Sequence, residues 1–234
     1  MITTVLFDLD GTLLPMDNDE FIKYYFGLLC KKAAPRGYEA KELIDSIWTG
    51  TAAMVMNDGT KTNEKAFWDK FCEIMGEEAR KDIDLFDDFY RNEFNGAKAV
   101  CGYNQNLIDL VHELKKEGKR IILATNPIFP EVATLNRIEW AGFSRDDFEL
   151  ITTYENIGFS KPNPEYYREI LRRINVPARE CLMVGNDAKE DMIASEVGIK
   201  VYLLTDHLIN KENIDISVYP NGDYTGIRKL LEDE

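Results

Sequence analysis

The part of the chain after Gly102 alternates between two hydrophobic patterns, and this alternation restricts the fold more than any other feature. Short apolar runs rich in branched residues indicate buried strands, and amphipathic stretches with a period of about 3.6 residues indicate helices. Parallel strands need a crossover connection, which is usually a helix. The alternation therefore predicts an α/β protein in which helices cover a parallel sheet.

Glycine and proline residues mark the ends of the predicted elements. We expect strands at residues 120–125, 148–152, 181–184, 200–204 and 214–218, and helices at residues 104–117, 130–141, 188–197 and 224–231. One further helix should begin at Pro164, with Asn163 as its N-cap. A separate apolar strand starts at residue 2 and is followed by two aspartates and a glycine.

Between this first strand and the alternating part, the pattern is helical from about residue 17 to about residue 94. Aromatic and aliphatic residues recur at helical spacing, and breaks are expected at residues 34–37, 57–60, 76 and 95–96. Four or five helices should result. The sequence thus predicts a core of residues 1–15 and 99–234, interrupted by an all-helical domain of residues 16–98.

The net charge of −14 argues against a general nucleic-acid or anionic-membrane partner, because both need clustered Lys and Arg. An anionic substrate would need a locally positive site. Lys31, Lys32 and Arg36 could reach one, although a solvated helix end explains this cluster more simply. The N-terminus enters a strand without the features of a signal peptide, and no apolar run has the length of a membrane span, so we expect a cytoplasmic protein.

The four cysteines are widely scattered and form no Cys-x-x-Cys pair, which disfavours a zinc knuckle or a dithiol redox site. The two histidines, His112 and His207, each stand alone in the sequence. Serine-histidine catalysis and histidine-rich metal sites are therefore poor candidates. The carboxylates at the ends of strands are better ones.

Asp8 and Asp10 lie two residues apart directly after the first apolar strand. On an extended backbone their side chains leave the same face, where two like charges repel unless a cation lies between them. Gly11 allows a sharp turn, and the Thr12 hydroxyl can stabilise it. Judged alone, this segment is equally well explained as an acidic turn after a strand.

The order Asp8-x-Asp10-Gly11-Thr12 after a buried strand resembles the first motif of the haloacid dehalogenase-like hydrolase superfamily. The resemblance implies that Asp8 is a nucleophile that becomes an aspartyl-phosphate. It also implies that Asp10 is a general acid/base that holds Mg²⁺ through its backbone carbonyl, so that both aspartates contact the metal. Three further motifs should follow in order along the chain.

The second motif is expected at the end of the strand of residues 120–125, and the third around Lys161. Thr125 and Asn126 end the strand of residues 120–125, and the resemblance implies that Thr125 and Lys161 hold phosphoryl oxygens, with Thr12 and Asn126 as further phosphate-binding residues. A capped strand end alone would also explain Thr125 and Asn126. Lys161 precedes Pro162, which keeps the lysine out of helical geometry, and its ammonium would offset the charge of nucleophile and phosphate.

The fourth motif is expected in the segment Gly185-Asn186-Asp187-x-x-x-Asp191. Many members of the family carry Asp directly after the glycine, whereas this chain has Asn186 there and the acid one place later. We rank Asp187 first and Asn186 second as the metal contact, with Asp191 in a supporting or water-mediated position. The choice between Asn186 and Asp187 stays open. All candidate ligands are hard oxygens, which favours Mg²⁺.

Taken together, the four motifs resemble those of a magnesium-dependent phosphatase with a Rossmann-like core and an inserted helical cap. The resemblance implies hydrolysis of a small phosphorylated metabolite by a monomer or homodimer, with no nucleic-acid or membrane partner. Phosphoglycolate, a sugar phosphate, a nucleotide and pyrophosphate all remain open as substrates. Dehalogenation of 2-haloacids, phosphomutase chemistry and non-catalytic binding of a phosphorylated ligand or a partner are the alternatives.

Overall fold

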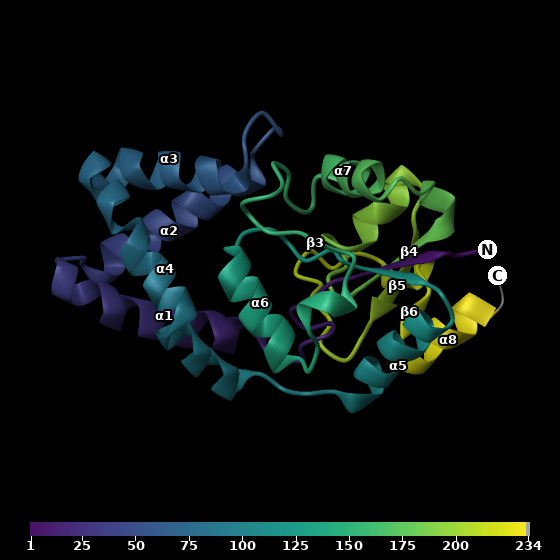
Figure 1. Ribbon diagram of the computed structural model, residues 1–234. Helices are drawn as coiled ribbons and strands as arrows, with labels where there is room; N and C mark the ends of the chain where they lie inside the picture. Colours follow the sequence, from purple (N-terminus) through teal and green to yellow (C-terminus); the bar gives the residue numbers. More distant parts are fainter. Residues whose placement is uncertain (233–234) are drawn as a thin grey trace.

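The computed structural model describes residues 1–232 and contains one six-stranded parallel sheet (Figure 1). The strand order is β3-β2-β1-β4-β5-β6, so the first strand of the chain lies in the interior of the sheet between β2 and β4. The strands are β1 (Thr4–Phe7), β2 (Arg120–Leu123), β3 (Leu150–Ile151), β4 (Cys181–Gly185), β5 (Lys200–Leu204) and β6 (Asn221–Gly222). This arrangement confirms the predicted α/β fold.

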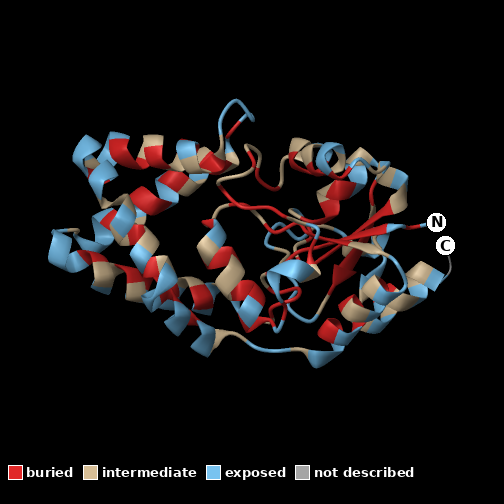
Figure 2. Ribbon diagram, viewed as in Figure 1, coloured by how far each residue is buried: buried red, intermediate tan, exposed pale blue. Residues whose placement is uncertain are grey.

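Both faces of the sheet are covered, which explains why its central strands β1 and β4 are buried and almost entirely apolar. Every residue of β1 is buried, and its side chains alternate between two hydrophobic clusters: Val5 and Phe7 belong to one, Leu6 to the other. The first cluster includes residues of α5 (Gln105–Lys116), α6 (Glu131–Trp140) and α8 (Tyr224–Glu232). The second includes residues of α7 (Pro164–Ile174) and the 3₁₀ segment η6 (Met192–Val197). The buried strands form the centre of Figure 2.

Residues 18–100 form a separate group of helices between β1 and α5, here called the helical region. It contains α1 (Asn18–Ala33), α2 (Ala40–Val55), α3 (Asn63–Met75) and α4 (Ile83–Arg91), with the 3₁₀ segments η1 (Ala34–Arg36), η2 (Glu77–Asp82) and η3 (Glu93–Val100). Gly37 and Gly76, at two of the expected breaks, have φ near +89° and +88°. The expected break at residues 95–96 is absent, because η3 runs through it. The division of the chain into two domains stays a prediction.

The two segments that join the helical region to the sheet run side by side. Met16 and Cys101 form an isolated antiparallel bridge, and the amide of Gly102 donates to the carbonyl of Pro15 at 2.6 Å. Helix α6 lies between the helical region and the sheet in Figure 1. The Asn63 side chain at the start of α3 donates to the Pro127 carbonyl at 3.1 Å, which adds a second point of attachment. The helical region therefore faces the edge of the sheet where the strands end.

Two predicted elements near the C-terminus are wrong. Residues 188–197 were expected as one helix, but a turn precedes the 3₁₀ segment η6, which begins with the tighter hydrogen bond from the Ala194 amide to the Asp191 carbonyl three residues back. Residues 214–218 were expected as a strand, but Asp215 accepts from the Ser217 amide and starts the 3₁₀ segment η7 (Ile216–Val218). Strand β6 follows only at residues 221–222.

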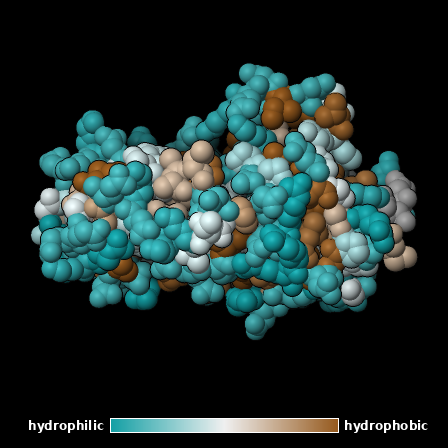
Figure 3. Space-filling model, turned by 90° about the horizontal axis from the view of Figure 1, so that it is seen from above, coloured by the Kyte–Doolittle hydropathy of each residue, from teal (hydrophilic) through white to brown (hydrophobic). Residues whose placement is uncertain are grey.

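The remaining 3₁₀ segments are η4 (Arg145–Asp147) and η5 (Ala178–Glu180). Among the helices of residues 1–232, none has the length and apolar character needed to cross a membrane. The face of the molecule in Figure 3 carries mainly hydrophilic residues, with smaller hydrophobic groups between them.

Candidate active site

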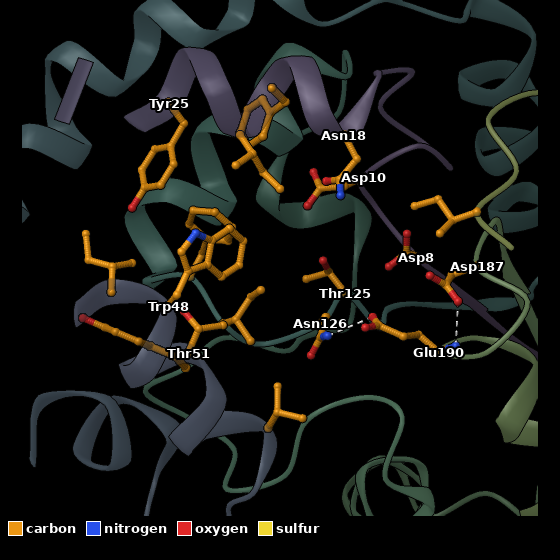
Figure 4. Close-up of a pocket in the computed structure, with 18 of the residues that line it drawn as sticks. Asp8, Asp10, Asn18, Tyr25, Trp48, Thr51, Thr125, Asn126, Asp187 and Glu190 are labelled. Carbon is orange, nitrogen blue, oxygen red and sulfur yellow. Dashed lines mark hydrogen bonds between the residues drawn. The ribbon is translucent and has the colours of Figure 1, made fainter. Parts of the chain in front are cut away.

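A cavity of about 490 Å³ lies where the ends of the central strands meet the helical region. Asp8 follows β1, Thr125 follows β2 and Asn186 follows β4, and all three residues line it. The carboxyl ends of parallel strands are where ligands bind in open α/β sheets. Figure 4 shows Asp8, Asp187 and Glu190 on one side of this cavity and Tyr25 and Trp48 on the other.

Asp8 forms an ion pair with a fully buried lysine. Nζ of Lys161 lies 2.9 Å from Oδ1 of Asp8 and 2.6 Å from Oδ1 of Asp191, and the lysine is only 1% exposed. Burial by itself lowers the pKa of Lys161, but the carboxylates of Asp191 and Asp8 more than offset this and hold the pKa well above its usual value. Lys161 is therefore a fixed positive charge beside Asp8.

Asn126 helps to place this lysine. Its Oδ1 accepts from the backbone amide of Lys161 at 3.2 Å, and its Nδ2 donates to a carboxylate oxygen of Glu190 at 2.9 Å (Figure 4). The next peptide bond, Lys161-Pro162, is cis. Because both ends of the Asn126 amide have protein partners, this residue links the loop after β2 to the lysine. The direct phosphate contact suggested by the sequence stays a prediction.

Asp191 is buried behind Lys161. One of its oxygens accepts from the lysine, and Oδ2 accepts from the backbone amide of Asp187 at 2.9 Å. A Cβ at position 185 would overlap this carboxylate, which explains the glycine at the end of β4. Burial raises the pKa of Asp191, and the adjacent ammonium opposes that shift. Asp191 is thus arranged as a counter-ion of Lys161.

Thr12 connects Asp8 with Asn186. Its hydroxyl lies 3.3 Å from Oδ2 of Asp8 and 3.1 Å from Oδ1 of Asn186, while Nδ2 of Asn186 donates to the His207 carbonyl at 2.7 Å. Gly11 makes this approach possible, because it has φ of +80° and any Cβ there would overlap the Asn186 amide. The turn predicted from the sequence therefore brings the first and fourth motifs into contact.

Asp187 and Glu190 occupy the turn after Asn186. Oδ1 of Asp187 accepts from the amides of Lys189 and Glu190, both at 2.8 Å. The Glu190 carboxyl lines the cavity, and burial raises its pKa to about 7, partly opposed by the charge of Lys161. Glu190 was not among the site residues predicted from the sequence. Its spacing, one residue before Asp191, gave no sign that it would face Asn126.

Asp10 is held by a buried arginine, Arg137, which was also not predicted as a site residue from the sequence. Arg137 of α6 is fully buried and donates from Nη1 to Oδ2 of Asp10. Nη2 of Arg137 lies 3.3 Å from the Thr134 hydroxyl, and the guanidinium lies 4.4 Å from the centre of the Phe129 ring. Burial raises the pKa of Asp10, and Arg137 opposes the shift. The sequence feature that could have identified Arg137 is its position as a single cation on the apolar face of the helix predicted at residues 130–141.

The oxygen atoms at this edge fit a hard divalent cation. Asp8, Asp10, Asn186 and Asp187 line the same cavity, and Oδ1 of Asp10 is a buried atom without a hydrogen-bond partner in the described part of the chain. Residues 1–232 contain no group of three His, Cys, Asp or Glu side chains that would form a complete metal site by themselves. A metal here would therefore take further oxygens from backbone, amide, water or substrate, as Mg²⁺ commonly does.

Comparisons with known proteins identify the family and the fold. The haloacid dehalogenase-like hydrolase family matches residues 2–198. Pyrophosphatase PpaX of Bacillus velezensis is 23% identical over 199 residues, which cover 85% of this chain and 81% of PpaX. Protein CbbY of Cereibacter sphaeroides is 28% identical over 104 residues, which cover 44% of this chain and only 45% of CbbY. The crystal structure of a HAD phosphatase from Thermococcus onnurineus shares the fold, with a TM-score of 0.61, 17% identity, and coverage of 100% of this chain and 99% of that one.

Proposed function

Because the chain belongs to the haloacid dehalogenase-like hydrolase family, we propose that it is a Mg²⁺-dependent phosphatase that hydrolyses small phosphate monoesters through a phosphorylated Asp8. The observation that carries this proposal is the buried ion pair between Asp8 and Lys161 at the end of β1. Similarity to PpaX and to a HAD phosphatase supports phosphate as the group that is transferred.

Asp8 is better placed as the nucleophile than the other carboxylate bound to Lys161. Asp8 directly follows β1 and is 7% exposed, whereas Asp191 lies behind Lys161 and is only 1% exposed. An oxygen of Asp8 would attack phosphorus, and the bond between phosphorus and the leaving alkoxide would break. The ammonium of Lys161 offsets the negative charge that gathers there.

Asp10 would move the proton in both half-reactions. It lines the cavity two residues beyond Asp8, and its Oδ1 has no hydrogen-bond partner within residues 1–232. In the first step Asp10 would give its proton to the leaving alkoxide, and in the second it would take one from the water that attacks phosphorus. The products are the alcohol and inorganic phosphate, and Asp8 is regenerated.

The metal would be held by Asp8, the backbone carbonyl of Asp10, and Asn186 or Asp187. When bound, it would neutralise charge on the phosphoryl oxygens. Thr125 lies two residues after β2 and lines the cavity, and it would donate its hydroxyl to the same group. We infer that the helical region acts as a cap that excludes bulk water during the reaction.

The proposal is tested by a phosphate-release screen of phosphorylated metabolites with Mg²⁺ and with EDTA. Asp8→Asn should lower kcat by more than about 10³-fold, because the amide cannot act as the nucleophile. Asp146→Asn is the matched control, since Asp146 is exposed in η4, away from the cavity. Retained turnover in Asp8→Asn would refute the nucleophile, and halide release from 2-haloacids without phosphate release would favour dehalogenation.

A further inference from the structure

The side of the cavity formed by the helical region is almost entirely aromatic and aliphatic. Eight aromatic rings of α1, α2, α3 and α4 line the cavity, and we define the aromatic wall as six of them: Tyr25, Phe26, Trp48, Trp68, Phe86 and Tyr90. Figure 4 shows Tyr25 and Trp48 facing the space opposite Asp8. The two sides of the cavity therefore offer a ligand very different surroundings.

The rings of the aromatic wall support one another. The Phe26 ring centre lies 4.8 Å from that of Tyr25 and 5.6 Å from that of Trp48, and the centres of Trp68 and Phe86 are 5.4 Å apart. Trp48 is nevertheless 46% exposed, although it borders a cavity large enough for a drug-sized ligand. Exposed aromatic surface in such a cavity is available for an apolar group.

The polar atoms of the wall are uncharged. The hydroxyls of Tyr25 and Tyr90 are 2.9 Å apart and hydrogen-bond to each other, and burial raises the pKa of both phenols above the usual value. Asn18 and Thr51 add one amide and one hydroxyl. A ligand group resting on this wall would meet hydrogen-bonding groups but no formal charge.

No cation of the helical region lines the cavity in the described part of the chain. The basic cluster noticed in the sequence lies elsewhere: Lys32 pairs with Asp88 and Glu93, and Arg36 pairs with Asp82. The two lysines that do border the cavity, Lys189 and Lys211, belong to the core side and face Glu212 and Asp19, respectively. A second anionic group on the substrate would therefore lie on the aromatic wall without a counter-ion, which is costly.

From this asymmetry we propose that the preferred substrates are phosphate monoesters of bulky, uncharged and largely apolar alcohols. The proposal rests on the phosphatase function above, and it names the substrate class of that same site. The phosphate would lie at Asp8 and Lys161, and the organic group would pack on the aromatic wall. Phosphoglycolate and pyrophosphate, which carry a second anionic group, would be poor substrates.

The test compares phosphate esters of primary alcohols, so that the leaving groups have similar intrinsic reactivity. Benzyl and hexyl phosphate should show kcat/KM at least about tenfold above glycerol 3-phosphate and phosphoglycolate, since even one methylene in an apolar pocket is worth roughly that factor. Pyrophosphate is measured beside them. A preference for phosphoglycolate or pyrophosphate, or equal kcat/KM for all esters, would overturn the substrate class and leave the phosphatase function standing.

A binding measurement separates this inference from the proposed function. Asp8→Asn, titrated calorimetrically, should bind benzyl phosphate at least about tenfold more tightly than phosphoglycolate. That result without turnover by the unmodified enzyme would retain the ligand class and reject the phosphatase function. Tighter binding of phosphoglycolate would reject the ligand class.

Variants of α2 test whether the aromatic wall causes the preference for apolar phosphate esters. Trp48→Ala should lower the ratio of kcat/KM for benzyl phosphate to that for glycerol 3-phosphate, and Trp48→Phe should restore most of it. Thr51→Lys places a cation in the cavity and should raise the relative kcat/KM for phosphoglycolate. Thr49→Lys is the matched control, because Thr49 is exposed on the same helix outside this cavity and should leave the ratios unchanged. An unchanged ratio in both Trp48→Ala and Thr51→Lys would contradict the proposal.

Discussion

The two sides of the cavity are built on opposite principles. At the strand ends, charged groups are buried and nearly every one has a fixed partner: Lys161 with Asp8 and Asp191, and Arg137 with Asp10. On the aromatic wall, neutral rings pack on one another and the two buried hydroxyls bind each other. This difference teaches that the proposed reaction at the strand ends and the proposed choice of leaving group on the aromatic wall depend on different residues. Substitutions on one side therefore need not disturb the other side.

Among the changes that compare the two sides of the cavity, the largest effect is expected from removing the positive charge of Lys161 at the strand ends. Lys161→Met should lower kcat by about 10²–10³-fold, because the phosphoryl group loses a preorganised donor. It should also lower the free energy of unfolding by about 3–5 kcal/mol, since Asp191 would be left buried without its counter-ion. Steady-state kinetics and urea unfolding measure the two effects.

Two further variants make this prediction sharper. Lys116→Met, at an exposed position of α5, should change neither quantity. Adding Asp191→Asn to Lys161→Met should recover part of the lost stability but not the lost activity. If the double variant is no more stable than Lys161→Met, the buried ion pair is not the cause.

A smaller effect should distinguish the two neighbours that compete for the metal. Asn186→Ala or Asp187→Ala should raise the Mg²⁺ concentration for half-maximal activity by about 10–100-fold if the residue contacts or orients the metal. The Thr12 hydroxyl places the Asn186 oxygen beside Asp8, whereas Oδ1 of Asp187 already caps a turn. Metal titrations of both variants decide whether Asp187 is the more important metal contact, as expected from the sequence, or whether Asn186 is.

How far the sequence predicts these two sides differs for a physical reason. The strands, Asp8 and Lys161 could be predicted from the sequence. Burial on both faces makes the central parallel strands apolar, and the motifs follow the strands in order along the chain. The turn and 3₁₀ segment of residues 188–197 could not be told from a helix, since the two kinds of helical turn share nearly the same hydrophobic pattern over a short stretch. Arg137 and the aromatic wall depend on how α6 and the helical region dock, which local sequence does not specify.

Paired glycine substitutions compare the two regions by their tolerance of a single methyl group. Gly185→Ala should lower the free energy of unfolding by about 1–3 kcal/mol, because the new Cβ would overlap the Asp191 carboxylate. Gly27→Ala should stabilise the protein by up to about 1 kcal/mol, because Gly27 is exposed inside α1 and nothing lies within 4 Å of the added Cβ. Equal effects in urea unfolding would mean that the strand-end side is no more tightly packed than α1.

The smallest effect should come from the hydroxyl pair of the aromatic wall. Tyr25→Phe and Tyr90→Phe should each cost about 0.5–1.5 kcal/mol of unfolding free energy, because each leaves one hydroxyl without its partner. The double variant should cost clearly less than the sum, since removing both hydroxyls leaves an apolar surface with nothing to satisfy. A double-mutant cycle by urea unfolding measures this coupling. The pair of Lys161 and Asp191 should behave differently. Replacing both of those residues removes the positive charge that the phosphatase reaction needs, so activity stays low. Replacing both tyrosine hydroxyls leaves the rings of the aromatic wall in place, so the surface that would receive the leaving group is kept. Strictly additive costs would show that the two hydroxyls do not act as a pair.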